Sequence, residues 1–74
     1  MAHERISADP KVMMGKPCIK GTRITVELIL RLLAKKHPIA EILDGYPGLK
    51  EDDIYAAQAY AADYLASERI LAAE

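Results

Sequence analysis

Hydrophobic residues recur at helical spacing in the middle of the chain, over the segment TVELILRLLAKK. One face of this segment carries the apolar residues Val26, Ile29, Leu30 and Leu33, at spacings of three and four. Thr25 precedes them and suits an N-cap, because its hydroxyl can accept a hydrogen bond from a free backbone N–H of the first turn. The pattern predicts a first helix over residues 26–36, which Pro38 ends.

Two more helical segments follow. PIAEILDG, residues 38–45, is short and places Ile39, Ile42 and Leu43 on one face, with Gly45 suited to the position after its end. The third segment starts near Lys50 and continues to residue 74 without a breaker. Acidic residues fill its first turn, where the helix dipole favours them. Its apolar stripe is loose and includes small residues as well as large ones: Ile54, Ala57, Ala61, Tyr64, Leu65 and Leu71.

Glycine and proline interrupt the first 24 residues, and short apolar pieces lie between them. These pieces, at residues 5–7, 11–14, 17–19 and 23–25, predict two or three very short strands or a hairpin. So few strands are not stable alone in water and need a helix layer or a second chain. The sequence therefore predicts a single mainly α domain over 1–74. A short β element in 1–24 precedes three helices in 25–74, in the outline of a helix-turn-helix module.

The composition limits how large a core this domain can build. The chain has 74 residues, and its 51% hydrophobic content includes 12 alanines but no Phe and no Trp. A domain of this size buries only ~60% of the surface of its unfolded chain. Sharing a core with a second copy is a common remedy, so we expect a homodimer.

The chemistry-bearing residues do not suggest catalysis or metal binding. Cys18 is the one cysteine, which excludes an intrachain disulfide, and the two histidines lie far from it in sequence. Asp52 and Asp53 are adjacent, so on a helix their side chains diverge by ~100°. We expect a non-enzymatic protein without a metal or cofactor. Without a visible signal peptide or membrane span, we expect it to be cytoplasmic.

Charge is unevenly distributed along the chain. Residues 1–36 carry eight basic and three acidic residues, a net charge of +5, whereas residues 37–74 carry two basic and eight acidic residues, a net charge of −6. A polyanion would bind the first half and a basic partner the second. An asymmetric but merely solvated surface is the alternative.

Two longer strings carry a family resemblance. GKPCIKGTRITVELIL, followed by EILDGYPGLKEDDIYAAQAYA, resembles the domain-of-unknown-function family 433, small bacterial and archaeal proteins with a homeodomain-like helix-turn-helix. The match runs from about Ile6 to Leu65. Members are similar to antitoxins and are often encoded beside a PIN-type nuclease. The resemblance implies an antitoxin-like protein that binds DNA at one end and a toxin-like partner at the other.

The basic residues give two interpretations. As phosphate contacts, the candidates for nucleic-acid binding are Lys16, Lys20, Arg23, Arg31, Lys35 and Lys36. Alternatively, the segment around Gly21 is only a turn, in which Thr22 forms local hydrogen bonds and Arg23 pairs with an acid such as Glu27 or with a carbonyl. The acids at the start of the third helix would repel DNA, which disfavours this helix as the element that enters a groove.

The third helix supplies the candidates for partner binding. These are Glu51, Asp52, Asp53, Tyr60 and Tyr64. The acids would face a basic partner and the tyrosines would add amphipathic contact area. Alternatively, the acids only stabilise the helix start, and the tyrosines pack within the chain or at a dimer contact. A protein-interaction or assembly module that never touches nucleic acid is the second functional reading.

Overall fold

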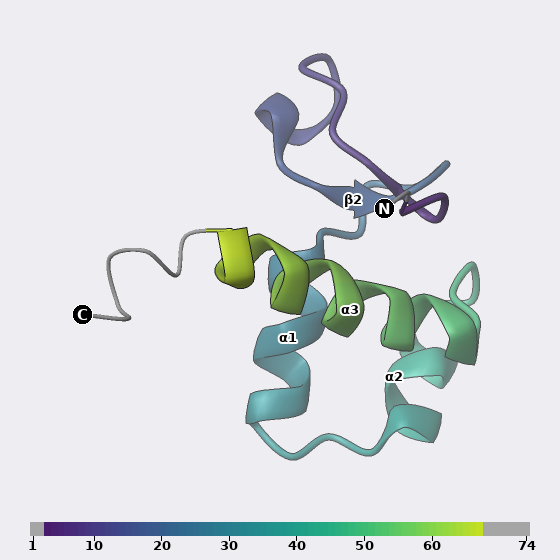
Figure 1. Ribbon diagram of the computed structural model, residues 1–74. Coiled ribbons are helices and arrows are strands. Elements are labelled where there is room, and N and C mark those ends of the chain that lie inside the picture. Colours follow the sequence, from purple (N-terminus) through teal and green to yellow (C-terminus); the bar gives the residue numbers. More distant parts are fainter. Residues whose placement is uncertain (1–2, 68–74) are drawn as a thin grey trace.

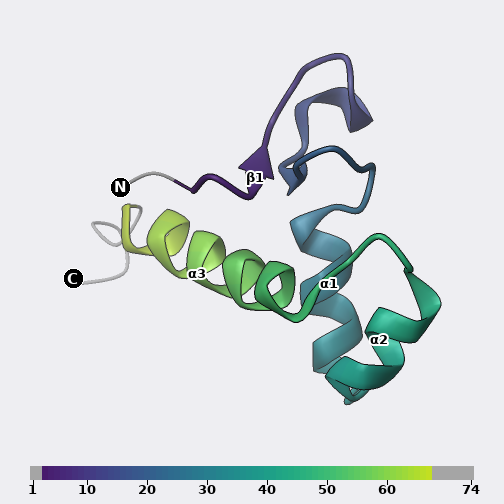
Figure 2. The ribbon, with the colours of Figure 1, turned by 90° about the vertical axis from the view of Figure 1, so that its right-hand side faces the viewer.

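The structure is a computed structural model, and it describes residues 3–67. Its elements in order are β1 (Ile6–Ser7), a 3-10 turn η1 (Met13–Gly15), β2 (Cys18–Ile19), α1 (Val26–Ala34), α2 (Ile39–Gly45) and α3 (Glu51–Ser67). The predicted mainly α fold, with a short β element before three helices, is confirmed. Helix α3 lies across the molecule, between the β element on one side and α2 on the other, and it packs on α1 (Figures 1 and 2).

The β element is a minimal antiparallel pair. β1 and β2 pair with Ile6 opposite Ile19, and beyond β2 the chain turns back so that Thr25 forms an isolated bridge with Cys18. The predicted piece at 23–25 is thus a single bridge rather than a strand. Because β1 also packs against α3, the helix layer supports a strand pair that would be unstable in isolation.

Of the four apolar pieces, the one at residues 11–14 does not form a strand. This segment forms a turn in which Met13, Met14 and Gly15 all have positive φ angles of 50°, 57° and 86°. The carboxylate of Asp9 accepts a hydrogen bond from the backbone N–H of Lys11 at 2.8 Å, which begins the turn. The apolar residues of this segment are compatible with a strand, but a left-handed backbone does not have the extended conformation that pairing in a sheet requires.

The helix boundaries follow the predicted signals with small shifts. The Thr25 hydroxyl accepts the Leu28 N–H at 2.9 Å, which confirms the predicted N-cap. Helix α1 ends at Ala34, two residues early, because Lys36 adopts a left-handed φ of 69°. Pro38 is the N-cap of α2 rather than its first helical residue. Helix α3 begins as predicted, and its expected continuation through residues 68–74 lies outside the described residues.

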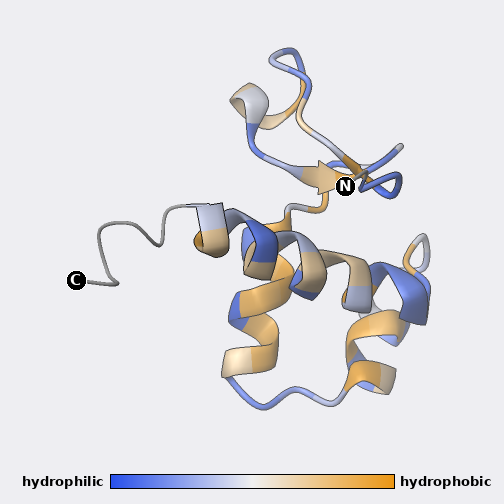
Figure 3. Cartoon of the chain, viewed as in Figure 1, coloured by the Kyte–Doolittle hydropathy of each residue, from blue (hydrophilic) through white to orange (hydrophobic). Residues whose placement is uncertain are grey.

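The core is small and lies where α1 and α3 cross. Ile29, Ile54 and Ala57 are fully buried. The buried apolar cluster joins them to Ile19, Val26, Ile42 and Leu49. Figure 3 shows α1 as a largely hydrophobic helix beside the mixed surface of α3. Within residues 3–67, no side chain after Ala57 is buried, so the second half of α3 extends past the core. No helix among these residues is long and apolar enough to cross a membrane.

Candidate functional site

Residues 19–24 form a tight turn between β2 and α1. The Ile19 N–H donates to the Ile24 carbonyl at 2.9 Å, and Gly21 supplies the positive φ of 82° that the turn needs. The Thr22 hydroxyl donates to the Ile19 carbonyl at 2.8 Å and accepts the Ile24 N–H at 3.0 Å. The predicted turn around Gly21 is therefore confirmed, and its own hydrogen bonds hold it rigid.

This turn presents two cations to solvent. Lys20 and Arg23 are exposed, and no ion pair involving either is formed within residues 3–67. The suggested pairing of Arg23 with Glu27 is not formed. Within the same residues, the backbone N–H groups of Gly21 and Arg23 donate to no protein acceptor. Among the described residues, the turn thus combines two cationic side chains outside any ion pair with two N–H groups that donate to no protein acceptor.

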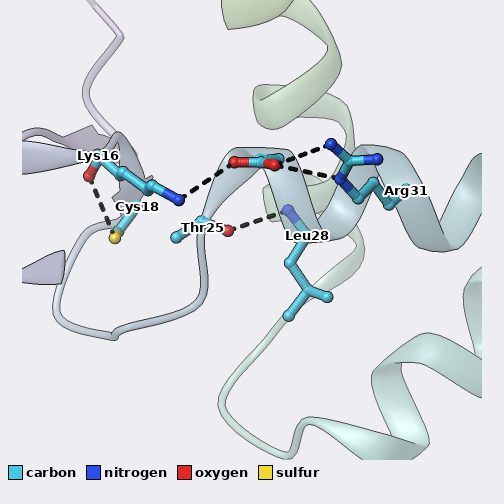
Figure 4. A network of polar contacts seen from close by, with 6 residues as sticks. Lys16, Cys18, Thr25, Leu28 and Arg31 are labelled. Atoms are coloured by element: carbon cyan, nitrogen blue, oxygen red, sulfur yellow. Dashed lines mark hydrogen bonds and ion pairs between the residues drawn. The ribbon is translucent and has the colours of Figure 1, made fainter.

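Lys16 and Arg31, two more of the residues predicted to bind nucleic acid, both contact Glu27 on the exposed side of α1. Its carboxylate accepts hydrogen bonds from Arg31 Nε at 3.1 Å and Nη2 at 3.0 Å, and Lys16 Nζ lies 3.5 Å away (Figure 4). The Arg31 hydrogen bond, followed by the charge of Lys16, lowers the pKa of Glu27 below its ordinary value. Lys16 and Arg31 are therefore partly neutralised within the chain.

Lys35 and Lys36 lie at the far end of α1. The nine residues of this helix rise by roughly 14 Å, which separates these lysines from the turn at Lys20 and Arg23. The structure thus divides the six predicted basic residues into three groups along α1. Within residues 3–67, the turn group is the one of the three that combines unpaired side chains with backbone N–H groups that have no protein acceptor.

The three acidic residues in the first turn of α3 differ in their exposure to solvent. Glu51 and Asp52 are exposed, but Asp53 is buried. The Asp53 carboxylate accepts the Lys50 backbone N–H at 2.9 Å, which caps α3, and accepts Arg5 Nη1 at 2.9 Å. Asp53 was predicted to face a partner, but its carboxylate is occupied inside the chain, where it fixes both the start of α3 and the N-terminal segment.

The predicted tyrosines lie at the other end of α3. Tyr60 is half-buried against the core, and its ring stacks near that of Tyr64 with centroids 6.4 Å apart. Tyr60 lies nine positions after Glu51 on α3, which is a rise of roughly 14 Å along the helix. The expected partner-binding residues therefore form two separate groups, an acidic one at the start of α3 and an aromatic one further along.

Sequence reasoning missed the residues that tie the N-terminal segment to α3. Arg5 reaches Asp53 as well as Asp52, whose Oδ2 lies 3.5 Å from Nη2. His3 Nε2 lies 2.9 Å from the Asp63 carboxylate, and its ring meets Tyr60 edge to face. These partners are 48 and 60 residues apart in sequence, and no local pattern marks them. Cys18 is buried, as expected of a small apolar residue.

The chain belongs to the DUF433 family, whose model, "Protein of unknown function (DUF433)", matches residues 6–61. A DUF433 protein from Anabaena variabilis, known from a crystal structure, is 30% identical. It matches with a TM-score of 0.78 over 95% of this chain and 69% of its own. The uncharacterized protein y4eO of Sinorhizobium fredii is 30% identical over 60 residues, which are 81% of this chain. An uncharacterized protein of Archaeoglobus fulgidus is 59% identical over 29 residues, which are 39% of this chain and 81% of that protein.

The chain spans only part of some relatives. The match covers 27% of the Sinorhizobium fredii protein, so that relative contains much more than this domain. The shared region establishes the family and the fold.

The two neighbouring aspartates of α3 provide a matched test of the internal role of Asp53. Asp53→Asn should lower the free energy of unfolding by about 1–2 kcal/mol, because it weakens a cap and a charge-assisted hydrogen bond. Asp52→Asn removes the same charge from an exposed side chain and should change stability by less than ~0.5 kcal/mol. Urea unfolding followed by circular dichroism measures both. Equal effects would show that Asp53 has no special structural role.

The lowered pKa of Glu27 gives a pH dependence of defined sign. The pKa of Glu27 is lower in the folded state than in the unfolded state. The contacts of Glu27 with Arg31 and Lys16, called here the Glu27 network, therefore stabilise the fold fully at pH values above the unfolded-state pKa. This contribution is lost as the pH falls through the folded pKa. In a carboxyl-detected NMR titration, Arg31→Gln should raise the Glu27 midpoint, and Lys16→Gln should raise it less. A midpoint that neither substitution moves would contradict the network.

Proposed function

We propose that this chain is a non-enzymatic, antitoxin-like protein that binds DNA through the turn at residues 20–23. One observation carries the proposal. Lys20 and Arg23 are exposed on a rigid turn, beside the free backbone N–H groups of Gly21 and Arg23. The family's helix-turn-helix resemblance agrees with this role.

The chemistry of the turn suits a phosphate group. Lys and Arg neutralise backbone phosphates and release counterions, while free N–H groups can hydrogen-bond phosphate oxygens. The hydrogen bonds of Thr22 fix the turn before any ligand arrives, so little conformational entropy is lost on binding. Such contacts position a protein on DNA, and they do not by themselves read its sequence.

The other basic groups have supporting roles in this proposal. Lys35 and Lys36 are exposed and offer a second phosphate contact at the far end of α1. Lys16 and Arg31 are held by Glu27, and they contribute less net charge. Helix α3 does not enter a groove with its first turn, because the exposed carboxylates of Glu51 and Asp52 would meet the phosphates and repel them.

The acidic side of α3 supports the partner half of the proposal. Glu51 and Asp52 are exposed at the start of α3 and offer negative charge to a basic surface of a PIN-type nuclease partner. Tyr60 and Tyr64 lie further along the same helix. The same exposed acids favour the second candidate, a protein-interaction module without nucleic-acid binding.

Fluorescence anisotropy with the DNA upstream of the gene and a scrambled duplex, at several salt concentrations, tests the DNA-binding role. The double substitution Lys20→Gln with Arg23→Gln should weaken binding about tenfold or more at low salt. It should also reduce the slope of log K against log salt by about 2, one unit for each lost phosphate contact. Lys50→Gln is the matched control, because Lys50 is exposed at the acidic start of α3 and should leave affinity unchanged.

Preference for the upstream duplex would support a regulator that acts at its own gene. If the double substitution lowers log K by only twice the change that Lys50→Gln causes, the effect per removed charge is the same at both places, and the turn is excluded as the specific contact. Weak binding to both duplexes that neither change affects would favour the protein-interaction candidate.

A further inference from the structure

A hollow of about 530 Å³ lies beside the turn that carries Arg23. Its lining comes from three parts of the chain: Ser7 of β1, Asp9 and Val12 of the loop that follows, and residues 21–23 of the turn. A volume of this size is within the range of roughly 300–1,000 Å³ that small-ligand sites occupy. The proposed phosphate contact therefore forms one wall of a concave site.

Two opposite charges line this hollow without neutralising each other. Within residues 3–67, neither Asp9 nor Arg23 forms an ion pair, although both side chains line the same space. The Asp9 Oδ1 atom accepts the Lys11 backbone N–H at 2.8 Å. Its Oδ2 atom has no donor among the same residues, so the carboxylate keeps an acceptor for a ligand.

The position of Asp9 is unfavourable for a bare phosphate and favourable for a base. A carboxylate beside a phosphate contact repels the phosphate. In nucleic acids, the group that suits a carboxylate is the exocyclic amino group of a base, such as N4 of cytosine, whereas a guanidinium suits the phosphate. The two charges of the hollow thus match the two ends of one nucleotide.

We propose that the hollow holds one unpaired base of the bound DNA, with its phosphate at Arg23 and its amino group donating to Asp9. This inference rests on the proposed DNA contact of the turn, and it adds a base preference to that contact. The base is unpaired because a paired base presents only its edge in a groove, whereas a hollow of this volume receives a whole ring. Val12 offers an apolar surface to the face of the ring.

A matched pair of ligands tests the role of Asp9. Cytosine and uracil are pyrimidines of similar size, but uracil carries a carbonyl oxygen where cytosine has its amino group, and this oxygen would face the carboxylate. Fluorescence anisotropy at low salt compares oligodeoxycytidylate and oligodeoxyuridylate single strands of about 12 nucleotides, a length that small single-strand-binding domains cover. The parent should bind the cytosine strand more tightly by about fivefold or more, the lower end of what one base contact discriminates.

Asp9→Asn should abolish this preference without disturbing the loop. The amide oxygen of Asn still accepts the Lys11 N–H, while its NH₂ group is a donor and has nothing to accept from the amino group of cytosine. Removing a negative charge strengthens the binding of any strand, so the readout is the ratio of the two Kd values. Asp44→Asn is the control, because it removes an exposed acid at the end of α2, outside the hollow, and should preserve the ratio.

A parent that binds both strands equally, or an Asp9→Asn variant that keeps the preference, would overturn this inference. The same preference with both strands paired to their complements would indicate a base edge read in a groove, and would also overturn it. The DNA contact of the turn fails on a different result: Lys20→Gln with Arg23→Gln would leave the affinity for duplex and single strands unchanged. Binding that depends on Lys20 and Arg23 but shows no base preference would keep that contact and reject the base site.

Discussion

The burial of Ile29 of α1 and Ile54 of α3 in one cluster is the constraint on which the rest of the structure depends. Both side chains are fully buried where the two helices cross, and Ala57 is small enough to let the helices approach closely. This crossing fixes α3 across the molecule. Further along α3, the two helices line a groove to which Leu65 and its neighbours contribute.

The N-terminal segment reaches α3 by polar contacts in addition to its strand pairing. Arg5 binds the buried carboxylate of Asp53, which also caps α3, so one side chain connects the first residues of the chain to the last helix. The same segment leads through β2 into the turn that ends at α1. Both candidate sites, the basic turn and the hollow beside it, are thus positioned by the contacts of one small core and one buried acid.

Local signals in the sequence predicted the helices well. The N-cap at Thr25 and the acidic start of α3 depend on neighbouring residues, and the structure confirms both. The Gly21 turn was also predictable, because positive φ and a local hydroxyl bond are properties of adjacent residues. The apolar segment around Met13 could not be distinguished from a strand in the sequence, because its hydrophobic residues do not indicate the left-handed backbone that the structure shows.

The candidate sites were less predictable, because they depend on distant pairings. The count of charges along the sequence suggested that Lys16 and Arg31 are available to bind an anion, yet both form ion pairs with Glu27. It also treated Asp53 as a surface acid, yet Asp53 is buried and binds Arg5, which lies 48 positions earlier in the sequence. The hollow beside the turn depends on how β1, the loop after it and the turn come together, which no stretch of sequence specifies alone.

The proposed DNA contact depends on the turn at residues 20–23 reaching a phosphate group. An NMR titration of the ¹⁵N-labelled chain with a short duplex tests it most directly, because it reports on the individual backbone N–H groups. We expect the amide signals of Gly21 and Arg23 to shift first and furthest, while those of Glu51 and Asp52 stay in place. Shifts confined to the start of α3, with the turn unchanged, would contradict it.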